Sequence, residues 1–113
     1  MKESDREKLK RIVSLWSSLR SQIEARSITK ELLMTDEFLQ WAVTTPLYNI
    51  GEQVYSLSRE VKDQYPDIPW NVVSGLRHRL VHNYEGVNWS IIVEIVFDEM
   101  DGFVQAAADV LKE

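Results

Sequence analysis

The sequence predicts an all-α fold, an antiparallel four-helix up-and-down bundle with one short extra helix. Apolar residues recur at three- and four-residue steps in four long segments, as in amphipathic helices. No segment alternates for long enough to form a sheet, and the connections are short, which favours antiparallel neighbours. With 113 residues and 44% hydrophobic content, the chain fits a single domain over residues 1–113.

The first long helix is expected over residues 5–25. Its apolar stripe consists of Leu9, Ile12, Val13, Trp16, Leu19 and Ile23. Ser27 can then cap a short helical turn that runs through Leu33. Either Thr35 or Asp36 can cap the second long helix, so the sequence predicts a break between the two long helices.

The second long helix is expected over residues 36–57, with an apolar stripe that continues past Pro46 and Gly51. The stripe consists of Leu39, Val43, Leu47, Ile50, Val54 and Leu57. Pro46 should kink this helix, because proline lacks a backbone N–H and its ring clashes with the carbonyl four residues earlier. Residues 58–67 are polar and contain Pro66, so they are expected to form a connection with at most a short turn of helix.

The third long helix is expected to begin after an Asp67 cap and to end near His82, where residues 83–86 supply turn-forming chemistry. Its core face consists of Val73, Leu76 and Leu80. Asn88 can cap the fourth helix. The stripe of that helix consists of Trp89, Ile92, Val93, Val96, Met100, Phe103, Ala107 and Val110, broadened by Ile91, Ile95 and Val104. This arc is wider than a small monomer needs, so we expect part of it to face a second subunit.

The composition excludes several classes of protein. A formal charge of −5 argues against coating nucleic acid by bulk electrostatics, although a local RNA site is compatible with it. The absence of cysteine excludes disulfides and zinc-thiolate sites. No apolar run approaches the roughly 20 residues that cross a bilayer, and the charged residues 1–10 do not resemble a signal peptide. We therefore expect a cytoplasmic protein with no membrane partner and no cofactor.

Residues 77–84 concentrate several chemically versatile side chains. They include Arg77, His78, His82 and Tyr84, and these two histidines are the only ones in the chain. Histidine titrates near neutral pH, as proton transfer in a cell requires. The plainer interpretation is that cations at the end of a helix stabilise its last carbonyls. The two histidines lie four residues apart, but the motif offers no third ligand, so no metal is expected.

Two further groups of residues are candidates for binding. Arg77, His78 and Arg79 form a local positive patch, and Arg59 and Lys62 lie nearby in the sequence. Four tryptophans could stack on bases, although single aromatics in a helical stripe are more often core residues. They are Trp16, Trp41, Trp70 and Trp89, of which we expect the first and the last in particular to lie in the core.

The side chains of residues 77–84 could cleave RNA without a metal ion. A histidine could take the proton of a ribose 2′-hydroxyl, whose oxygen attacks the adjacent phosphate, while an arginine stabilises the charge that builds up there. The products would be a 2′,3′-cyclic phosphate and a 5′-hydroxyl. A second histidine from a partner subunit could protonate the leaving oxygen, so a homodimer suits this chemistry.

The pattern Arg77-x4-His82-x-Tyr84 adds a tyrosine to the Arg-x4-His spacing. Upstream, residues 48–52 read Tyr-Asn-Ile-Gly-Glu. Together these elements resemble the HepT-like toxins of the HEPN superfamily, which carry an Arg-x4-His-x-Tyr signature and an Ile-Gly-Glu element at this distance. The resemblance covers residues 27–108.

The resemblance implies an all-helical homodimer with the two motifs facing each other across a cleft. Similar proteins are RNases that are toxic to their own cell and are encoded beside a minimal nucleotidyltransferase antitoxin, which can transfer AMP to the motif tyrosine. Carried over to this chain, Arg77 would bind and stabilise phosphate, His82 would supply acid–base chemistry, and Tyr84 would be the AMPylation site. RNA would be the substrate, and DNA is not expected.

His78 departs from the family pattern, because relatives commonly have asparagine or another small polar residue after the arginine. As an auxiliary residue it could assist proton transfer or form a hydrogen bond across the dimer. Glu52 is expected to make a polar contact near the dimer interface, and Gln53, in place of alanine, bears on packing.

Two other functions remain open on the sequence alone. The first is a non-catalytic helical module that holds a nucleotide or substrate for an associated nucleotidyltransferase. The second is a purely structural helical dimer.

Overall fold

The computed structural model describes residues 1–81 and 86–113, and every regular element within these ranges is a helix. The prediction of an all-α fold is therefore confirmed. Residues 83–85 of the expected turn lie outside the described residues. No described helix combines the length and the apolar character that crossing a membrane requires.

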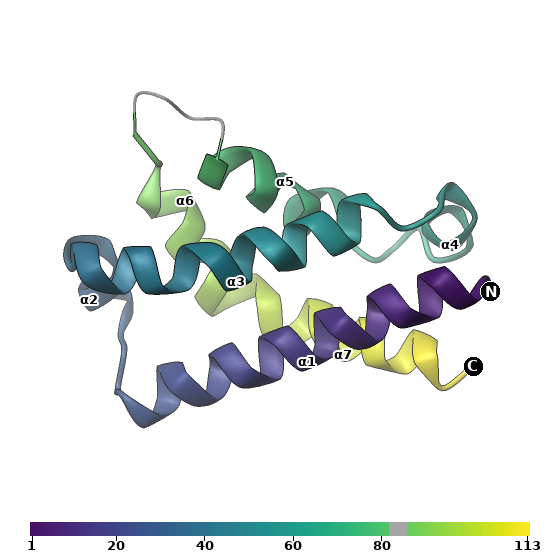
Figure 1. Ribbon diagram of the computed structural model, residues 1–113, viewed down its shortest axis with the longest axis horizontal. Coiled ribbons are helices and arrows are strands. Elements are labelled where there is room, and N and C mark those ends of the chain that lie inside the picture. The colour runs from purple at the N-terminus through teal and green to yellow at the C-terminus, as the bar shows by residue number, and fades with distance from the viewer. Residues whose placement is uncertain (82–85) are drawn as a thin grey trace.

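Four long helical segments make up most of the molecule, and Figure 1 shows their arrangement. Helix α1 (Glu3–Ala25) and helix α3 (Glu37–Tyr55) lie side by side and run in opposite directions. Helix α5 (Trp70–Val81) packs on α3, and helix α7 (Met100–Leu111) packs on α1. Pro46 lies inside α3, which continues through it without a break. The packing of α5 on α3 positions the motif that the sequence singled out.

Four shorter segments complete the described fold. They are α2 (Lys30–Thr35), α4 (Arg59–Gln64), α6 (Trp89–Glu94) and the π-helical segment η1 (Ile95–Glu99). Because α6, η1 and α7 follow one another directly, the single last helix that the sequence predicted contains a π-helical stretch. Apolar spacing did not reveal this stretch, because the buried positions still follow one another at steps of three and four residues across it.

Ser27 ends α1 and does not cap the next helix, contrary to the prediction. Its φ of 52° is left-handed, and the Ile28 N–H donates to the Ile23 carbonyl at 2.9 Å. This bond, together with the left-handed residue before it, forms a Schellman motif. The N-cap of α2 is instead Thr29, whose hydroxyl accepts a hydrogen bond from the Leu32 N–H at 3.2 Å.

Of the other predicted caps, Asp36 and Asn88 are confirmed and Asp67 is wrong. The Asp36 and Asn88 side chains each accept a hydrogen bond from the backbone N–H three residues later. Helix α5 begins only at Trp70, because residues 65–68 first form a hydrogen-bonded turn that contains Asp67. The cap was therefore expected too early.

Residues 58–67 contain more helix than the sequence suggested. Six of them form α4, which Ser58 caps by accepting a hydrogen bond from the Val61 N–H at 3.4 Å. Val61 is the one buried residue of this helix. A single buried position gives no periodic pattern, so the segment read as a polar connection.

The predicted apolar stripes form the core. Most of their members are buried, and Val13, Leu39, Ile91 and Trp89 are partly buried against the same cluster. Ile95 and Val104 are buried within this chain, and α7, which carries Val104, packs on α1. These two residues of the wide arc are therefore covered within the chain, and the expectation that part of the arc faces a second subunit stays a prediction. The exposed large apolar side chains are instead Met1, Leu32, Met34, Phe38, Trp41, Tyr55, Val72 and Val81.

The four tryptophans have different surroundings. Trp16 and Trp70 are buried, and Trp89 is partly buried against the core, so the core assignment of Trp16 and Trp89 is confirmed. The Trp70 and Phe103 rings lie perpendicular to each other, with 5.7 Å between their centroids. Trp41 is 66% exposed on α3 and does not belong to the core.

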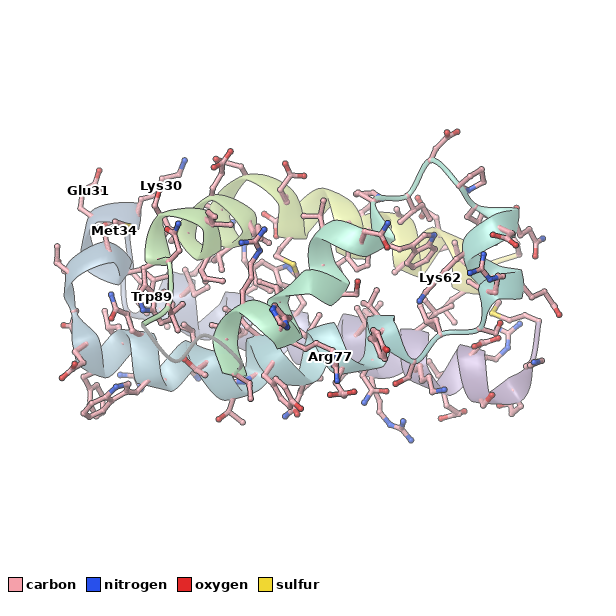
Figure 2. All side chains as sticks on the ribbon, turned by 90° about the horizontal axis from the view of Figure 1, so that it is seen from above. Lys30, Glu31, Met34, Lys62, Arg77 and Trp89 are labelled. Carbon is pink, nitrogen blue, oxygen red and sulfur yellow. The ribbon has the colours of Figure 1, made fainter. Side chains whose placement is uncertain are left out.

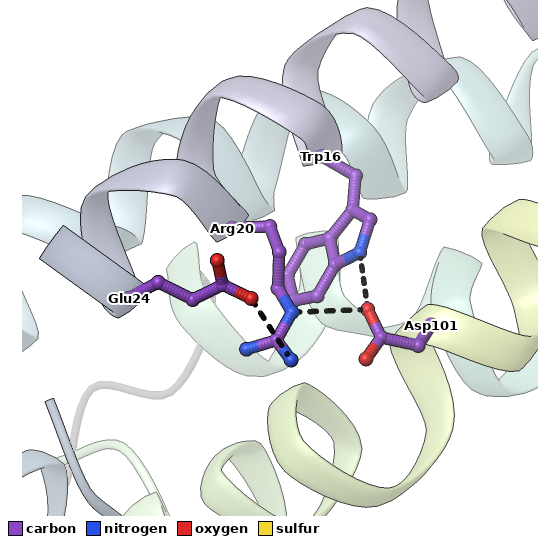
Figure 3. A network of polar contacts seen from close by, with 4 residues as sticks. All are labelled: Trp16, Arg20, Glu24 and Asp101. Atoms are coloured by element: carbon purple, nitrogen blue, oxygen red, sulfur yellow. Dashed lines mark hydrogen bonds and ion pairs between the residues drawn. The ribbon is translucent and has the colours of Figure 1, made fainter. Parts of the chain in front are cut away.

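A polar network joins α1 to the start of α7 (Figure 3). The Trp16 indole N–H donates to Asp101 Oδ1 at 2.9 Å, and Arg20 Nε lies 3.4 Å from the same oxygen. Arg20 also pairs with Glu24 at 3.4 Å. The network supplies the partner that a buried indole N–H needs, and it fixes the start of α7 directly after the π-helical stretch.

Asp5 is buried at the start of α1, with a relative exposure of 1%. Its carboxylate accepts hydrogen bonds from the Ser58 backbone N–H at 2.9 Å and from the Ser58 hydroxyl at 2.7 Å. Burial raises the pKa of the Asp5 carboxyl, but the two Ser58 hydrogen bonds, together with Lys8 and Lys2, bring it below its ordinary value. The charged carboxylate thus fastens α1 to the start of α4.

Candidate functional site

Arg77 lies on the side of α5 that packs against α3. The close approach of the two helices depends on Gly51, since a Cβ atom added there would lie 2.8 Å from the Arg77 backbone nitrogen and 3.2 Å from the Val73 carbonyl oxygen. The Ile-Gly-Glu element therefore has a packing role, because Gly51 leaves room for α5, the helix that carries Arg77.

Two side chains of α3 hold the Arg77 guanidinium. Its Nε donates to Glu52 Oε2 at 3.2 Å, and its central carbon lies 4.2 Å from the centroid of the Tyr55 ring. The Arg77 and Glu52 side chains are 28% and 35% exposed, so solvent weakens the pair and its contribution to stability is small. We infer that Glu52 and Tyr55 mainly fix the direction of the guanidinium, whose planar shape suits a phosphate.

Tyr48 extends this cluster one turn back along α3. Its hydroxyl forms a hydrogen bond with Glu52, and this bond is the largest cause that lowers the pKa of the Glu52 carboxyl, followed by the hydrogen bond from Arg77. The same bond raises the pKa of the Tyr48 phenol. Near neutral pH the carboxylate is therefore charged and the phenol keeps its proton, as a stable contact with Arg77 requires.

The expected positive patch of Arg77, His78 and Arg79 is not a single surface. Arg77 contacts α3, whereas Arg79, two positions along the same helix, lines a pocket together with Glu94 and Glu99. Two positions along an α-helix turn the side chain by roughly 200°, which places the two arginines on different sides. The two arginines are close in the sequence, but the helix places their charges on different sides.

Lys62 of α4 contacts the backbone of Tyr55. Its Nζ donates to the Tyr55 carbonyl at 3.2 Å, and it lines a pocket of about 690 Å³ together with Arg59. Burial and the neighbouring Arg59 lower the pKa of Lys62. Figure 2 shows Arg77 between α3 and α5 in the middle of the molecule, with Lys62 toward the α4 end.

The remaining predicted site residues follow Arg77 along the chain. His78 is exposed on α5. His82 and Tyr84 lie outside the described residues, so their predicted roles are carried forward as predictions. Residues 1–81 and 86–113 bring no three histidine or acidic side chains together in a group that could hold a metal ion.

The structure adds Tyr48 and Tyr55 to the site, neither of which the sequence assigned a role there. Tyr48, Glu52 and Tyr55 are spaced by four and three residues, so they share one side of α3. That spacing was visible in the sequence. What it could not reveal is that this side of α3, and no other, receives Arg77.

An apolar pocket of about 500 Å³ lies away from this cluster. It is formed between α1 and α3, and its walls include Leu15, Leu19, Phe38, Leu39 and Val43. It contains no residue of the Arg77 cluster, and Arg26 is its one charged side chain. The chemistry of a phosphate site therefore points to the Arg77 cluster and not to this apolar pocket.

Comparisons with known proteins show similarity to several proteins named as ribonucleases. A family model described as "Ribonuclease HepT-like" matches residues 6–110. "Putative RNase MJ0127" of Methanocaldococcus jannaschii is 31% identical over 86 residues, which cover 76% of this chain and 71% of that protein. "Putative RNase TTE0752" of Caldanaerobacter subterraneus subsp. tengcongensis is 31% identical over 88 residues, covering 78% of this chain and 79% of that protein.

A further relative carries the family name itself. "Probable ribonuclease HepT" of Thermococcus cleftensis is 31% identical over 75 residues, which cover 66% of this chain and 68% of that protein. No solved structure matches the chain.

Proposed function

Because the chain belongs to the HepT-like ribonuclease family, we propose that it is a metal-independent endoribonuclease that acts in the cytoplasm. The observation that carries the proposal is the placement of Arg77. Its guanidinium is held by Glu52 and Tyr55 at the surface, five residues before His82. Among the described residues only Nε of the guanidinium is hydrogen-bonded, which leaves its two terminal nitrogens for a phosphate.

In the proposed reaction the chain's own side chains move the protons. His82 takes the proton of a ribose 2′-hydroxyl, and the oxygen attacks the adjacent phosphorus while the bond to the 5′-oxygen breaks. Arg77 stabilises the negative charge that develops on the phosphate. His82 of a second copy returns a proton to the leaving 5′-oxygen. The products are a 2′,3′-cyclic phosphate and a 5′-hydroxyl.

Two matched substitutions in α5 test the arginine. Arg77→Ala should abolish most cleavage of single-stranded RNA in the presence of a chelator, whereas Arg79→Ala removes the same charge from another side of the helix and should leave cleavage nearly unchanged. His82→Ala should lower the rate about 10²- to 10⁴-fold, the usual contribution of general acid–base catalysis. Equal losses for Arg77→Ala and Arg79→Ala would reject the site, and no cleavage by the wild-type protein would favour the non-catalytic alternative.

We propose that the active form is a homodimer whose interface includes the exposed side of α3. Phe38 and Trp41 are 73% and 66% exposed there, and Trp41 lies seven residues before Tyr48, hence on the same side of the helix as the Arg77 cluster. Two copies meeting on this side would bring their motifs close. Trp41→Arg should convert a dimer into a folded monomer in light scattering and should reduce cleavage in parallel. A monomeric wild-type protein that cleaves RNA would contradict the proposal.

We further propose that the protein is the toxin of a toxin–antitoxin pair and that a minimal nucleotidyltransferase silences it by AMPylation of Tyr84. An adenylyl group adds bulk and negative charge two residues after His82, and both oppose RNA. Coexpression with the nucleotidyltransferase should increase the mass by one or more AMP units and relieve growth inhibition. Tyr84→Phe should abolish the mass increase, and an adduct that persists in this variant would assign the modification to another residue.

A further inference from the structure

Tyr55 presents an aromatic ring to solvent directly beside Arg77. It is the last residue of α3, and its side chain is 58% exposed. The Arg77 guanidinium lies 4.2 Å from the ring centroid on one face. No other aromatic ring of residues 1–81 and 86–113 stacks on Tyr55. The exposed part of the ring is therefore a flat apolar surface next to a group suited to phosphate.

A second cation, Lys62, contacts the backbone of Tyr55. The Lys62 ammonium donates one of its three protons to the Tyr55 carbonyl and is partly buried beside Arg59. Arg77 thus lies over the Tyr55 ring, and Lys62 bonds the main-chain carbonyl of the same residue. In a chain with a formal charge of −5, two cations in contact with one exposed tyrosine are a local departure from the overall acidity.

A purely structural role explains only part of this arrangement. A lysine that bonds the last carbonyls of a helix is favoured there by the helix dipole, and an arginine often packs on an aromatic face. Neither contact requires the ring to remain more than half exposed. Proteins that bind single-stranded nucleic acid combine these same parts, cations along the phosphates and rings on which bases stack.

We propose that Tyr55 is the stacking platform for a nucleobase next to the phosphate held by Arg77, and that Lys62 binds the neighbouring phosphate. The proposal rests on the proposed ribonuclease function and deepens it. It predicts an unpaired nucleotide at the site, because a base in a duplex cannot turn its face to the ring. It also predicts tolerance of base identity at this position, since every base has a face to stack.

The first experiment compares Tyr55 variants on two substrates, a single-stranded RNA that the wild-type protein cleaves and the same RNA with successive abasic positions around the cut. On the natural RNA, Tyr55→Leu should lose about tenfold to a hundredfold in cleavage, the range expected from stacking of one base, while Tyr55→Phe and Tyr55→Trp should stay near wild type. At one abasic position, Tyr55→Leu and the wild type should become equal. If the loss stays the same at every abasic position, Tyr55 acts only by holding Arg77 and the platform is rejected.

A binding experiment separates this proposal from the ribonuclease function. Short 2′-O-methyl RNA, which cannot be cleaved, carries the fluorescent base 2-aminopurine at successive positions. The wild-type protein should quench the fluorescence at one position, and Tyr55→Leu should abolish the quenching. Quenching by a protein that cleaves no RNA would overturn the ribonuclease function and retain the platform. Cleavage without Tyr55-dependent quenching would overturn the platform alone, and the absence of both would overturn both.

Lys62 is tested through the salt dependence of the same binding. For single-stranded RNA, each phosphate contact contributes about 0.7 to the slope of log K against log salt. Lys62→Gln should reduce the slope by about that amount. The control is Lys112→Gln, which removes the same charge from a side chain that is 76% exposed near the C-terminus. Equal slopes for the wild type and Lys62→Gln would remove the second phosphate from the proposal.

Discussion

A Cβ atom added to Gly51 would lie 2.8 Å from the backbone nitrogen of Arg77. Helices α3 and α5 can therefore pack at their observed separation only with a glycine at position 51. The contact also sets where Arg77 stands, because the guanidinium reaches Glu52 and Tyr55 from a backbone that lies directly on α3.

Gly51→Ala should lower the stability of the protein and its RNA cleavage together. Helix propensity alone would favour alanine by about 1 kcal/mol, but relieving a backbone clash typically costs about 1–3 kcal/mol and displaces Arg77. Urea unfolding and cleavage assays measure the two effects. The control is Gly102→Ala in α7, where an added Cβ meets nothing within 4 Å, so stability should rise. Equal gains in stability for both variants would show that α5 adjusts freely.

Glu52→Gln should reduce cleavage while the protein remains folded. The amide keeps the size of the side chain but loses the charge that directs the Arg77 guanidinium. We expect the cleavage rate to fall about tenfold, which corresponds to the lower end of the free energy of a hydrogen bond to a charged group, because the site is partly exposed. Glu31→Gln on α2 makes the same chemical change far from Arg77, as Figure 2 shows, and should have no effect. A cleavage rate for Glu52→Gln equal to that of this control would remove the positioning role.

Tyr48→Phe should move the acid limb of the activity profile to higher pH. The Tyr48 hydroxyl is the largest cause that lowers the pKa of Glu52, so its removal raises that pKa. Glu52 loses its charge when the pH falls through this value, and the contact with Arg77 weakens with it. Titration of the Glu52 carboxyl carbon by NMR measures the shift directly. An unchanged or lower pKa in the variant would show that the hydrogen bond does not control the carboxyl.

Asp5→Asn should destabilise the fold near neutral pH more than in acid. The folded pKa of Asp5 lies below its ordinary value of 3.8, so the charged form stabilises the folded state above the unfolded pKa and this stabilisation is lost as the pH falls through the folded pKa. Near pH 7 we expect a loss of about 1–3 kcal/mol, the range for leaving buried partners unsatisfied. Urea unfolding should show a smaller difference from the wild type in acid. The same difference at both pH values would contradict this account.

Ser27→Gly should stabilise the protein by about 0.5–1 kcal/mol. Ser27 has a φ of 52°, and this left-handed conformation costs a residue with a Cβ roughly 1–2 kcal/mol. Glycine avoids this cost, but its greater conformational freedom in the unfolded chain offsets part of the gain in stability. Thermal unfolding should record a rise of a few degrees. Ser27→Ala retains the Cβ and should give no such rise. If both variants behave alike, the left-handed conformation does not limit stability here.

The helices and most of the core could be predicted from the amino-acid sequence. Repeated apolar positions leave few alternatives to four amphipathic segments, and the Asp36 and Asn88 caps could be assigned because their bonds lie within three residues of chain. The misassigned cap at Ser27 and the unrecognised α4 were also local. The role of Ser27 depends on one backbone angle, and α4 buries a single residue, Val61. Neither feature produces a periodic pattern of apolar residues in the sequence.

The motif that marks Arg77 was equally visible in the sequence, because it is a spacing along one segment of chain. Its partners were decided only by the tertiary structure. Glu52 and Tyr55 lie more than twenty residues before Arg77, and they meet it because Gly51 lets α5 settle on one particular side of α3. The same rotation separates Arg77 from Arg79. Spacing along a chain records which residues share a helix face, but the face that a neighbouring helix covers depends on packing between segments distant in sequence.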